Sequence, residues 1–495
     1  MHPNELRPFP TAMAALATTV LPSFARTFLV AVALLATASA ASAADPEVEQ
    51  LKQQIRLLQQ RVEQLEKERS AAPPAAPVAP AVAPAPAAAQ PAPATLAPVE
   101  ALGQPSQVNE RGAMQDQQEA APRPGALTLD PKYKGFVQVP NTRVMIKFNA
   151  KPRVDFTLDN ENTGDDDRFV TAKIPVTGQP ATGGGTRFNI NAKGSQLKID
   201  VRAPEIPGSP RFYYENDFYG SGGGEFPYRI RHLYGQYYNI IVGQTFSIFE
   251  DPDVWPDTVD YEGPNSAIFA RRPLVRYLQP IGDEWQLNFG VEQPGGEIDT
   301  TGQPASISTV NHAPDGGINA RWEREDIGHV QLASIVRSLA VDDSARGKQS
   351  VLGWGFNLSS VLDTWGDDSW QGQATYGQGL FRYSNDDFVN NDAAFDHHGN
   401  LEAIPYLGLL MGYTHHWSPK WRSTASGGYV HLDNAASQAN DAYHQTVYGS
   451  LNVVYQYGPR LSIGLEGLYG RKETRDGNDG EVYRVEAGLV YSIFN

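Results

Sequence analysis

Hydrophobic and polar residues alternate along most of the chain after about residue 126. The segment 143–158, RVMIKFNAKPRVDFTL, has one face made of Val, Ile, Phe, Ala, Pro, Val, Phe and Leu. Its other face carries Arg, Met, Lys, Asn, Lys, Arg, Asp and Thr, and is therefore polar and basic. Because successive side chains of a β-strand point to opposite faces of the sheet, this period of two predicts a strand with one apolar and one basic face.

Sixteen segments of this kind follow one another, separated by turn residues. They are 143–158, 187–203, 210–219, 227–238, 240–248, 267–279, 284–293, 317–325, 328–340, 350–362, 369–383, 403–417, 420–433, 442–457, 460–472 and 481–494. The connections between them alternate strictly between short and long, which is typical of a transmembrane β-barrel with tight turns on one side and long loops on the other. We therefore predict an all-β membrane protein in which residues 127–495 form a 16-stranded antiparallel transmembrane β-barrel. A soluble β-sandwich is the alternative, but it would not explain sixteen strands with connections of unequal length.

One predicted strand, 187–203, changes phase along its length. Phe188 and Ile190 share one face, whereas Leu197 and Ile199 have the opposite parity. The change falls at Gly194–Ser195, so we predict a β-bulge there.

Three segments precede the predicted barrel. Residues 1–43 contain an apolar run at 28–38 followed by an A-x-A sequence, which predicts a signal peptide; a membrane anchor is the alternative, although the run is short. Residues 44–70 have apolar positions spaced 3-4-3-4-3, the a/d seam of a coiled coil, and a single amphipathic helix docked elsewhere is the alternative. The seam comprises Val48, Leu51, Ile55, Leu58, Val62 and Leu65. Residues 71–126 begin with an Ala/Pro-rich stretch, which bars helix and central strand and predicts an extended linker.

Composition excludes several classes of protein. The chain has 495 residues, a formal net charge of −16 and no cysteine. Without cysteine there are no disulfides and no thiolate metal sites, a composition that suits export through an oxidising compartment. The negative charge disfavours nucleic-acid binding. We find no uninterrupted 18-residue apolar run after residue 50, no nucleotide-binding loop, no metal-ligand spacing and no catalytic elbow, and we expect no cofactor.

The polar faces of the predicted strands are rich in cations although the chain as a whole is acidic. If these faces line a lumen, they form a basic ladder. The ladder comprises Lys147, Lys151, Arg153, Arg229, Arg231, Arg272, Arg276 and Arg321. Arginine holds carboxylates with a planar fork, so the ladder predicts attraction of anions. The alternative is that these cations balance acidic loop residues and stiffen the wall.

The connection 249–266 is the third of the predicted external loops, and it contains three prolines, six acids and no cation. The acids are Glu250, Asp251, Asp253, Asp257, Asp260 and Glu262. In position and charge it resembles the constriction loop of general porins, which would imply an inward fold and a transverse field across a narrow gap. The alternative is an exposed acidic loop that binds divalent cations or lipopolysaccharide.

The order of these segments, together with three motifs in the barrel, resembles the DcaP-like family of outer-membrane porins. The motifs are YYENDFYG at 213–220, YRIRHLYGQYYNIIVGQTFSIF at 228–249 and ARRPLVRY at 270–277. The resemblance implies a homotrimer of sixteen-stranded barrels in the bacterial outer membrane, a periplasmic coiled coil, and diffusion of small dicarboxylic or aromatic acids. The family's basic constriction would fall on Arg229, Arg231, Arg272 and Arg276. The heptad, with Val or Ile at a and Leu at d, favours two strands and so departs from a trimer.

We therefore expect a passive channel for small anionic solutes, surrounded by outer-membrane lipid and lipopolysaccharide, with the coiled coil available to peptidoglycan or periplasmic proteins. A structural, cell-wall-tethering barrel with little selectivity is the alternative. A barrel enzyme such as a lipase needs a nucleophile and a histidine side by side. The histidine pairs 397–398 and 415–416 show no matching serine and acid in the sequence, so we do not expect an enzyme.

Overall fold

The computed structural model describes Met114 and residues 135–179, 181–344, 347–389 and 391–493. The predicted signal peptide, the coiled coil with its seam, and the linker apart from Met114 lie outside the described residues. The chain divides into two units, Met1–Thr95 and Leu96–Asn495, and the description concerns the second unit.

The described residues form β-strands and three short 3-10 helices. The strands are β1 (Val137–Gln138), β2 (Met145–Lys151), β3 (Arg153–Asp159), β4 (Arg187–Asn191), β5 (Gln196–Arg202), β6 (Arg211–Asp217), β7 (Arg229–Tyr237), β8 (Ile240–Phe246), β9 (Arg271–Ile281), β10 (Trp285–Glu292), β11 (Ile307–Val310), β12 (Asp315–Arg324), β13 (Gly328–Asp343), β14 (Gly347–Asp363), β15 (Ser369–Gln378), β16 (Ala393–Phe395), β17 (Leu401–Ala403), β18 (Pro405–Ser418), β19 (Trp421–Leu432), β20 (Tyr443–Tyr457), β21 (Leu461–Thr474) and β22 (Asp479–Tyr491). The 3-10 helices are η4 (Thr171–Lys173), η5 (Pro252–Val254) and η6 (Phe381–Tyr383). Twenty strands belong to one antiparallel sheet, and β16 pairs with β17, so the all-β antiparallel prediction is confirmed.

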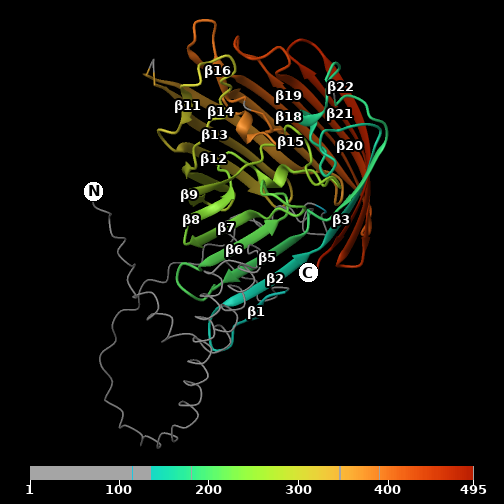
Figure 1. Ribbon diagram of the computed structural model, residues 1–495. Coiled ribbons are helices and arrows are strands. Elements are labelled where there is room, and N and C mark those ends of the chain that lie inside the picture. Colours follow the sequence, from blue (N-terminus) through green and yellow to red (C-terminus); the bar gives the residue numbers. More distant parts are fainter. Residues whose placement is uncertain (1–113, 115–134, 180, 345–346, 390, 494–495) are drawn as a thin grey trace, which may run out of the picture. The chain divides into compact units, whose positions relative to one another are not determined.

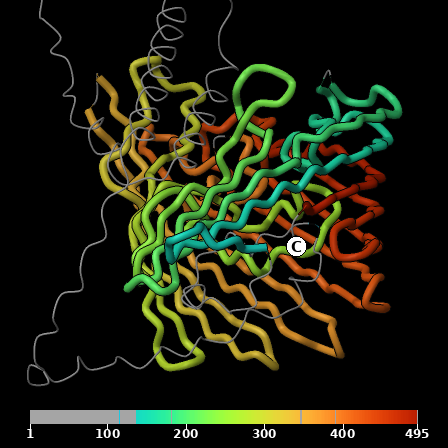
Figure 2. The backbone as a smooth tube through the Cα atoms, turned by 90° about the horizontal axis from the view of Figure 1, so that it is seen from below, coloured from blue at the N-terminus to red at the C-terminus, as the bar shows by residue number. Residues whose placement is uncertain are grey.

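Strands that follow one another in the chain are neighbours in the sheet. Pairing runs from β5 to β10, from β10 to β12, on to β15, and from β15 through β18 to β22. At the start of the sheet, β2 pairs with β5 and β3 pairs with β4. The last strand, β22, pairs with β3, so strands from the two ends of the sheet lie side by side. Figure 1 shows the strands arranged around an interior, and Figure 2 shows the same arrangement after a quarter turn.

Two predicted strands are interrupted. The first is divided into β2 and β3 at Pro152, which has no N–H for the ladder. The second is divided into β4 and β5 between Asn191 and Gln196, where the change of phase was predicted. On both sides of this break, Phe188 and Leu197 remain exposed, so the interruption restores the apolar side chains to one face.

The predicted strand 369–383 is wrong beyond Gln378, because the chain turns at Gly379, whose φ is 69°, and then forms η6. Much of the described part of the following segment to Ile404 is buried, although Val389, His397, His398 and Asn400 are exposed. Its short hairpin of β16 and β17 was not predicted.

The distribution of side chains is the reverse of that in a water-soluble protein. Outward-facing Leu451 is 63% exposed and Met411 62%, whereas Arg484 is 1% and Arg231 2% exposed. Apolar residues outside and polar residues inside are expected of strands that meet lipid on one face and a lumen on the other. The alternation read from the sequence therefore has the orientation predicted for a barrel in a membrane.

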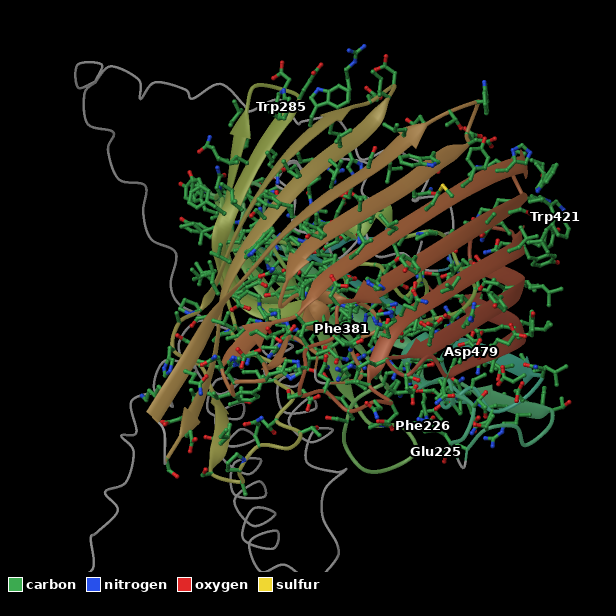
Figure 3. The ribbon with its side chains drawn as sticks, turned by 90° about the horizontal axis from the view of Figure 1, so that it is seen from above. Glu225, Phe226, Trp285, Phe381, Trp421 and Asp479 are labelled. Carbon is green, nitrogen blue, oxygen red and sulfur yellow. The ribbon has the colours of Figure 1, made fainter. Side chains whose placement is uncertain are left out.

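Exposed tryptophans gather near the short turns. Figure 3 shows Trp285 and Trp421 at one end of the sheet and Phe226 and Asp479 at the other, with Phe381 in the interior. Trp285 begins β10 and Trp421 begins β19, each directly after a short turn. Aromatic side chains at strand ends are typical of the membrane–water interface. No helix among the described residues is long and apolar enough to cross a membrane.

Three long loops contribute to the interior core. They follow β3, β8 and β15, and each contains one of the 3-10 helices. Val170, Phe249 and Phe381, one from each loop, belong to a single buried cluster. In the interior, side chains of these loops therefore pack against one another as well as against the wall.

Candidate functional site

The loop between β8 and β9 lies in the interior and is fixed to the wall at its beginning by Asp251. This carboxylate caps η5 by accepting the Asp253 backbone N–H at 3.1 Å. It also contacts Arg321 of β12 at 3.3 Å, accepts the Ser359 hydroxyl at 2.6 Å, and lies 2.8 Å from His329 Nε2. Strands β12, β13 and β14 thus hold the start of the loop together.

The charge of Asp251 is stabilised by these neighbours. Burial disfavours the ionised carboxyl, but His329 and Arg321 outweigh that effect, so the pKa of Asp251 lies well below its ordinary value. Ligand atoms of Asp251, Asp253 and His329 lie within 4.8 Å of one another, as in a metal site. Arg321 already bridges both carboxylates, at 3.3 Å and 2.7 Å, so the positive charge that a metal would bring is supplied by the chain itself.

The middle of the loop is fixed by Asp257 and Asp260. Arg422 Nε donates to Asp257 at 2.6 Å, and the Asp260 backbone N–H donates to Glu466 at 2.6 Å. The Asp260 carboxylate accepts the Phe169 N–H at 3.2 Å, and burial raises its pKa. These contacts join the loop to β19, β21 and the loop that follows β3.

Tyr261 binds the opposite wall. Its hydroxyl donates to Asp217 at 2.9 Å and accepts from Arg231 at 2.8 Å and from Gln196 at 3.1 Å. Its ring stacks on Tyr219 with centroids 5.0 Å apart. The loop therefore contacts β5, β6 and β7 as well, and crosses the interior from one side to the other.

All six acids predicted to mark this loop lie in the interior, with exposed fractions of 9% or less. Four of them pair with cations: Asp251 and Asp253 with Arg321, Asp257 with Arg422, and Glu262 with Arg168 at 3.0 Å. Glu250 instead accepts the Ala270 N–H at 2.9 Å, and burial raises the pKa of Glu250. The loop acids do not face a row of unpaired arginines, because most of these acids are themselves bound to partners in the interior.

Arg153, Arg229, Arg231 and Arg321 of the predicted ladder are also bound to carboxylates. Arg153 contacts Asp155 at 2.8 Å. Arg229 and Arg231 both contact Asp217, at 2.5 Å and 3.0 Å. Arg321 bridges the loop acids described above. At these four positions the contacts match the alternative given in the sequence analysis, in which the cations balance acidic residues and stiffen the wall.

Lys147 and Lys151 lie on the interior face of β2 with Arg153 of β3 beyond them, as the alternation predicted. Lys147 is partly exposed and Lys151 is buried. They extend the polar face toward the short-turn end of the first strand.

Arg272 and Arg276 differ from the other arginines of the predicted ladder. Arg272 Nη2 donates to the backbone carbonyl of Arg382 at 3.0 Å, and its guanidinium lies 5.6 Å from the ring centre of Tyr383. Arg276 donates to the carbonyl of Phe246 at a short distance. Within the described residues, neither guanidinium lies at salt-bridge distance from a carboxylate.

Arg382 completes this group and was missed by the sequence analysis. It lies on η6, is partly exposed, and within the described part of the chain it makes no salt bridge. We call Arg272, Arg276 and Arg382 the cation cluster. The signal that could have revealed Arg382 is the loss of alternation after Gly379, which places the arginine on an inward-folded loop instead of a strand.

His415 has an acid partner that could not be recognised in the sequence. His415 Nδ1 lies 2.6 Å from Asp368, and Tyr413 donates to the same carboxylate at 3.0 Å. Ser423 stands opposite His415 in the β18–β19 register, but its hydroxyl accepts the Trp417 indole N–H at 3.0 Å. No hydrogen bond joins Ser423 to His415 among the described residues, so a nucleophile–base pair is not formed.

An antiparallel sheet with apolar residues outside, polar residues inside and long loops folded into the interior defines the class of outer-membrane porins. The chain belongs to the DcaP outer membrane protein family, whose family model matches residues 135–492. The resemblance seen in the sequence is confirmed, as is the predicted location in the bacterial outer membrane. The members of this class are channels, which are not enzymes.

One solved structure agrees with this assignment at the level of the fold. The outer membrane channel DcaP of Acinetobacter baumannii aligns with a TM-score of 0.63 and 21% identity, covering 72% of this chain and 99% of that chain. The anion-selective porin from Comamonas acidovorans aligns with a TM-score of 0.46 and 11% identity, covering 71% of this chain and 100% of that chain. A search of curated proteins returned no match.

Proposed function

We propose that this protein is a porin for passive, anion-favouring diffusion of small solutes such as dicarboxylic or aromatic acids. The channel would run through a sixteen-stranded transmembrane barrel, counted by joining β2 to β3 and β4 to β5 and leaving out the short β1 and β11. The pairing of β22 with β3 supports a closed barrel, since it leaves the sheet without a free edge there.

The cation cluster is the observation that carries the anion preference. The acids of the third loop are largely compensated by Arg321, Arg422 and Arg168, whereas Arg272 and Arg382 remain partly exposed without a carboxylate in salt-bridge range among the described residues. A passing anion can therefore meet these two guanidinium groups without first displacing a buried partner. Binding of this kind is strong enough to admit an anion and weak enough to release it.

The decisive experiment is a planar-bilayer recording in a salt gradient. We expect stepwise conductance with a reversal potential on the anion-selective side, and a loss of selectivity in the double variant Arg272→Ala/Arg382→Ala. Arg143→Ala is the matched control, because Arg143 is an exposed arginine beside Glu205, outside the cluster.

A cation-selective reversal potential in the unmodified protein would overturn the anion preference. Conductance without any ionic preference would instead favour a structural, wall-tethering barrel, in which the coiled coil reaches peptidoglycan or periplasmic proteins. We further propose a homotrimer surrounded by outer-membrane lipid and lipopolysaccharide. Cross-linking of the purified protein in detergent tests the number of subunits.

A further inference from the structure

Met114 lies deep in the interior although it precedes the first strand of the sheet in sequence. It is 3% exposed and belongs to a buried cluster with Val259 of the third loop, Val454 of β20 and Val490 of β22. Its backbone N–H donates to Asp257 Oδ1 at 2.7 Å. The region predicted to be only a linker thus contributes one residue to the packing around the third loop.

Two glycines create the space for this contact. Gly464 of β21 and Gly488 of β22 are register partners. A Cβ atom at Gly464 would lie 2.5 Å from Val259 Cγ2, and one at Gly488 would lie 2.8 Å from Val259 Cγ1 and 3.2 Å from Met114 Cε. The missing side chains leave a notch in the wall, the glycine notch, which is filled by Val259 and Met114 together.

Asp257 links the Met114 backbone to Arg422 on the wall. One oxygen of its carboxylate accepts the Met114 N–H, and the other accepts from Arg422 Nε at 2.6 Å. A buried carboxylate is stabilised by each hydrogen bond that it accepts, because each one replaces a hydrogen bond to water that was lost on burial. Met114 therefore uses both an apolar and a polar contact, and both partners belong to the third loop.

We propose that the glycine notch is a docking site for Met114 of this same chain, which clamps the third loop against β21 and β22. The arrangement links the chain that precedes the barrel to the constriction itself. It goes beyond the proposed solute preference, because it concerns what holds the constriction in place and not which ion passes it.

The absence of cysteine allows a direct test in the full-length protein. Met114→Cys is combined with Val490→Cys, in the cluster, or with Leu489→Cys, the adjacent outward-facing residue. A short linker that reacts with two thiols is expected to join the first pair and not the second. Leu465→Cys/Ala487→Cys, register partners on β21 and β22, serves as the positive control for the chemistry.

The functional readout is the single-channel conductance of Met114→Glu. The added carboxylate would be buried among Val259, Val454 and Val490 without a counter-ion, so residue 114 should leave the notch, with an upward shift in conductance and more frequent current fluctuations. Cross-linking with Leu489→Cys as efficient as with Val490→Cys, or no linkage to Val490→Cys while the positive control reacts, would overturn the docking site. Conductance unchanged in Met114→Glu would overturn the clamp. Because the cross-links do not depend on ion preference, their outcome is independent of the proposed function.

Discussion

At the scale of single residues, buried arginines dominate the interior. Arg337 shows the principle: its side chain is fully buried, contacts Asp315 at 3.0 Å and Asp392 at 3.1 Å, and lies 4.9 Å from the ring centre of Tyr383. A charge removed from water needs such partners, since an unpaired buried ion is strongly disfavoured. The interior is therefore polar, but charged side chains such as Arg337 are held in fixed ion pairs.

Replacing Arg337 should be costly because two buried carboxylates would lose their counter-ion. We expect Arg337→Met to lower the free energy of unfolding by about 3–5 kcal/mol. Arg471→Met is the control, since Arg471 is exposed beside Asp479, and its replacement should change stability by only about 0.5 kcal/mol. Urea unfolding in lipid vesicles measures both values, and equal effects would contradict the interpretation.

At the scale of elements, the third loop combines local turns with contacts to most of the wall. Gly263 permits one of these turns: its φ is 72°, and a Cβ atom there would lie 2.8 Å from Trp255 Cζ2. The residue therefore needs both an unusual backbone conformation and the absence of a side chain. The loop can fold inward only if this bend is preserved.

Gly263→Ala should accordingly displace the loop, with a cost on the order of 1–3 kcal/mol from backbone strain and additional crowding against Trp255. Gly185→Ala separates these causes, because Gly185 has a similar φ of 74° but nothing within 4 Å of its added Cβ. Thermal unfolding and conductance should change more in the first variant. The same loss in both variants would mean that strain alone matters.

Glu250 gives the third loop a dependence on pH. Burial raises its pKa, so the folded state favours the protonated form. Its contribution to stability is full below the ordinary carboxyl pKa, about 4.3, and is lost as the pH rises through the raised value. Glu250→Gln keeps the neutral form at every pH.

We therefore expect the melting temperature of the unmodified protein to fall more steeply than that of Glu250→Gln between mildly acidic and alkaline buffers. The difference between the two profiles isolates Glu250 from other titrating groups. Parallel profiles would show that Glu250 carries no such linkage.

Strands and the third loop differ in how far the sequence predicts them. The period of two in β2 and β3 is local, and it correctly placed Lys147, Lys151 and Arg153 on one face. The partners of the third loop are not local: Asp257 and Arg422 lie 165 residues apart. The six acids could therefore be recognised as a set, but not the cations that bind them.

Arg382 shows that alternation along a strand can also mislead the sequence analysis. A continuous strand to residue 383 was predicted from alternation, whereas the turn at Gly379 places Arg382 on η6 beside Arg272. A glycine with positive φ can end a strand that polarity alone would continue. The cation cluster depends on this turn and was visible in the sequence only through its β9 members.

At the scale of the whole molecule, the outward band of apolar side chains is what adapts the sheet to lipid. Leu451 lies near the middle of β20 and Tyr457 at its end, and both are exposed, at 63% and 65%. Outward positions near the middle of a strand lie near the bilayer midplane, and those at the ends lie near the interface.

Leu451→Arg should destabilise the protein by about 2–4 kcal/mol and Tyr457→Arg by only about 0–1 kcal/mol, if the sheet spans a bilayer as proposed. The measurement is unfolding from lipid vesicles. In detergent micelles, which adapt around a charge more easily, the difference should become smaller. A larger effect at Tyr457 than at Leu451 would contradict the proposed depth of β20.

The pairing of β22 with β3 also has a consequence for the order of events in folding. Arg484 and Asp159, joined at 2.6 Å across this pair, are separated by 325 residues. Contacts so remote in sequence make folding slow, because a long chain must be ordered before they form. The final hydrogen-bonded seam can be made only once the C-terminal strand has been exported. Until then both edges are exposed to wrong pairing and aggregation, so the chain should depend on chaperones that shield unpaired strands during its passage to the membrane.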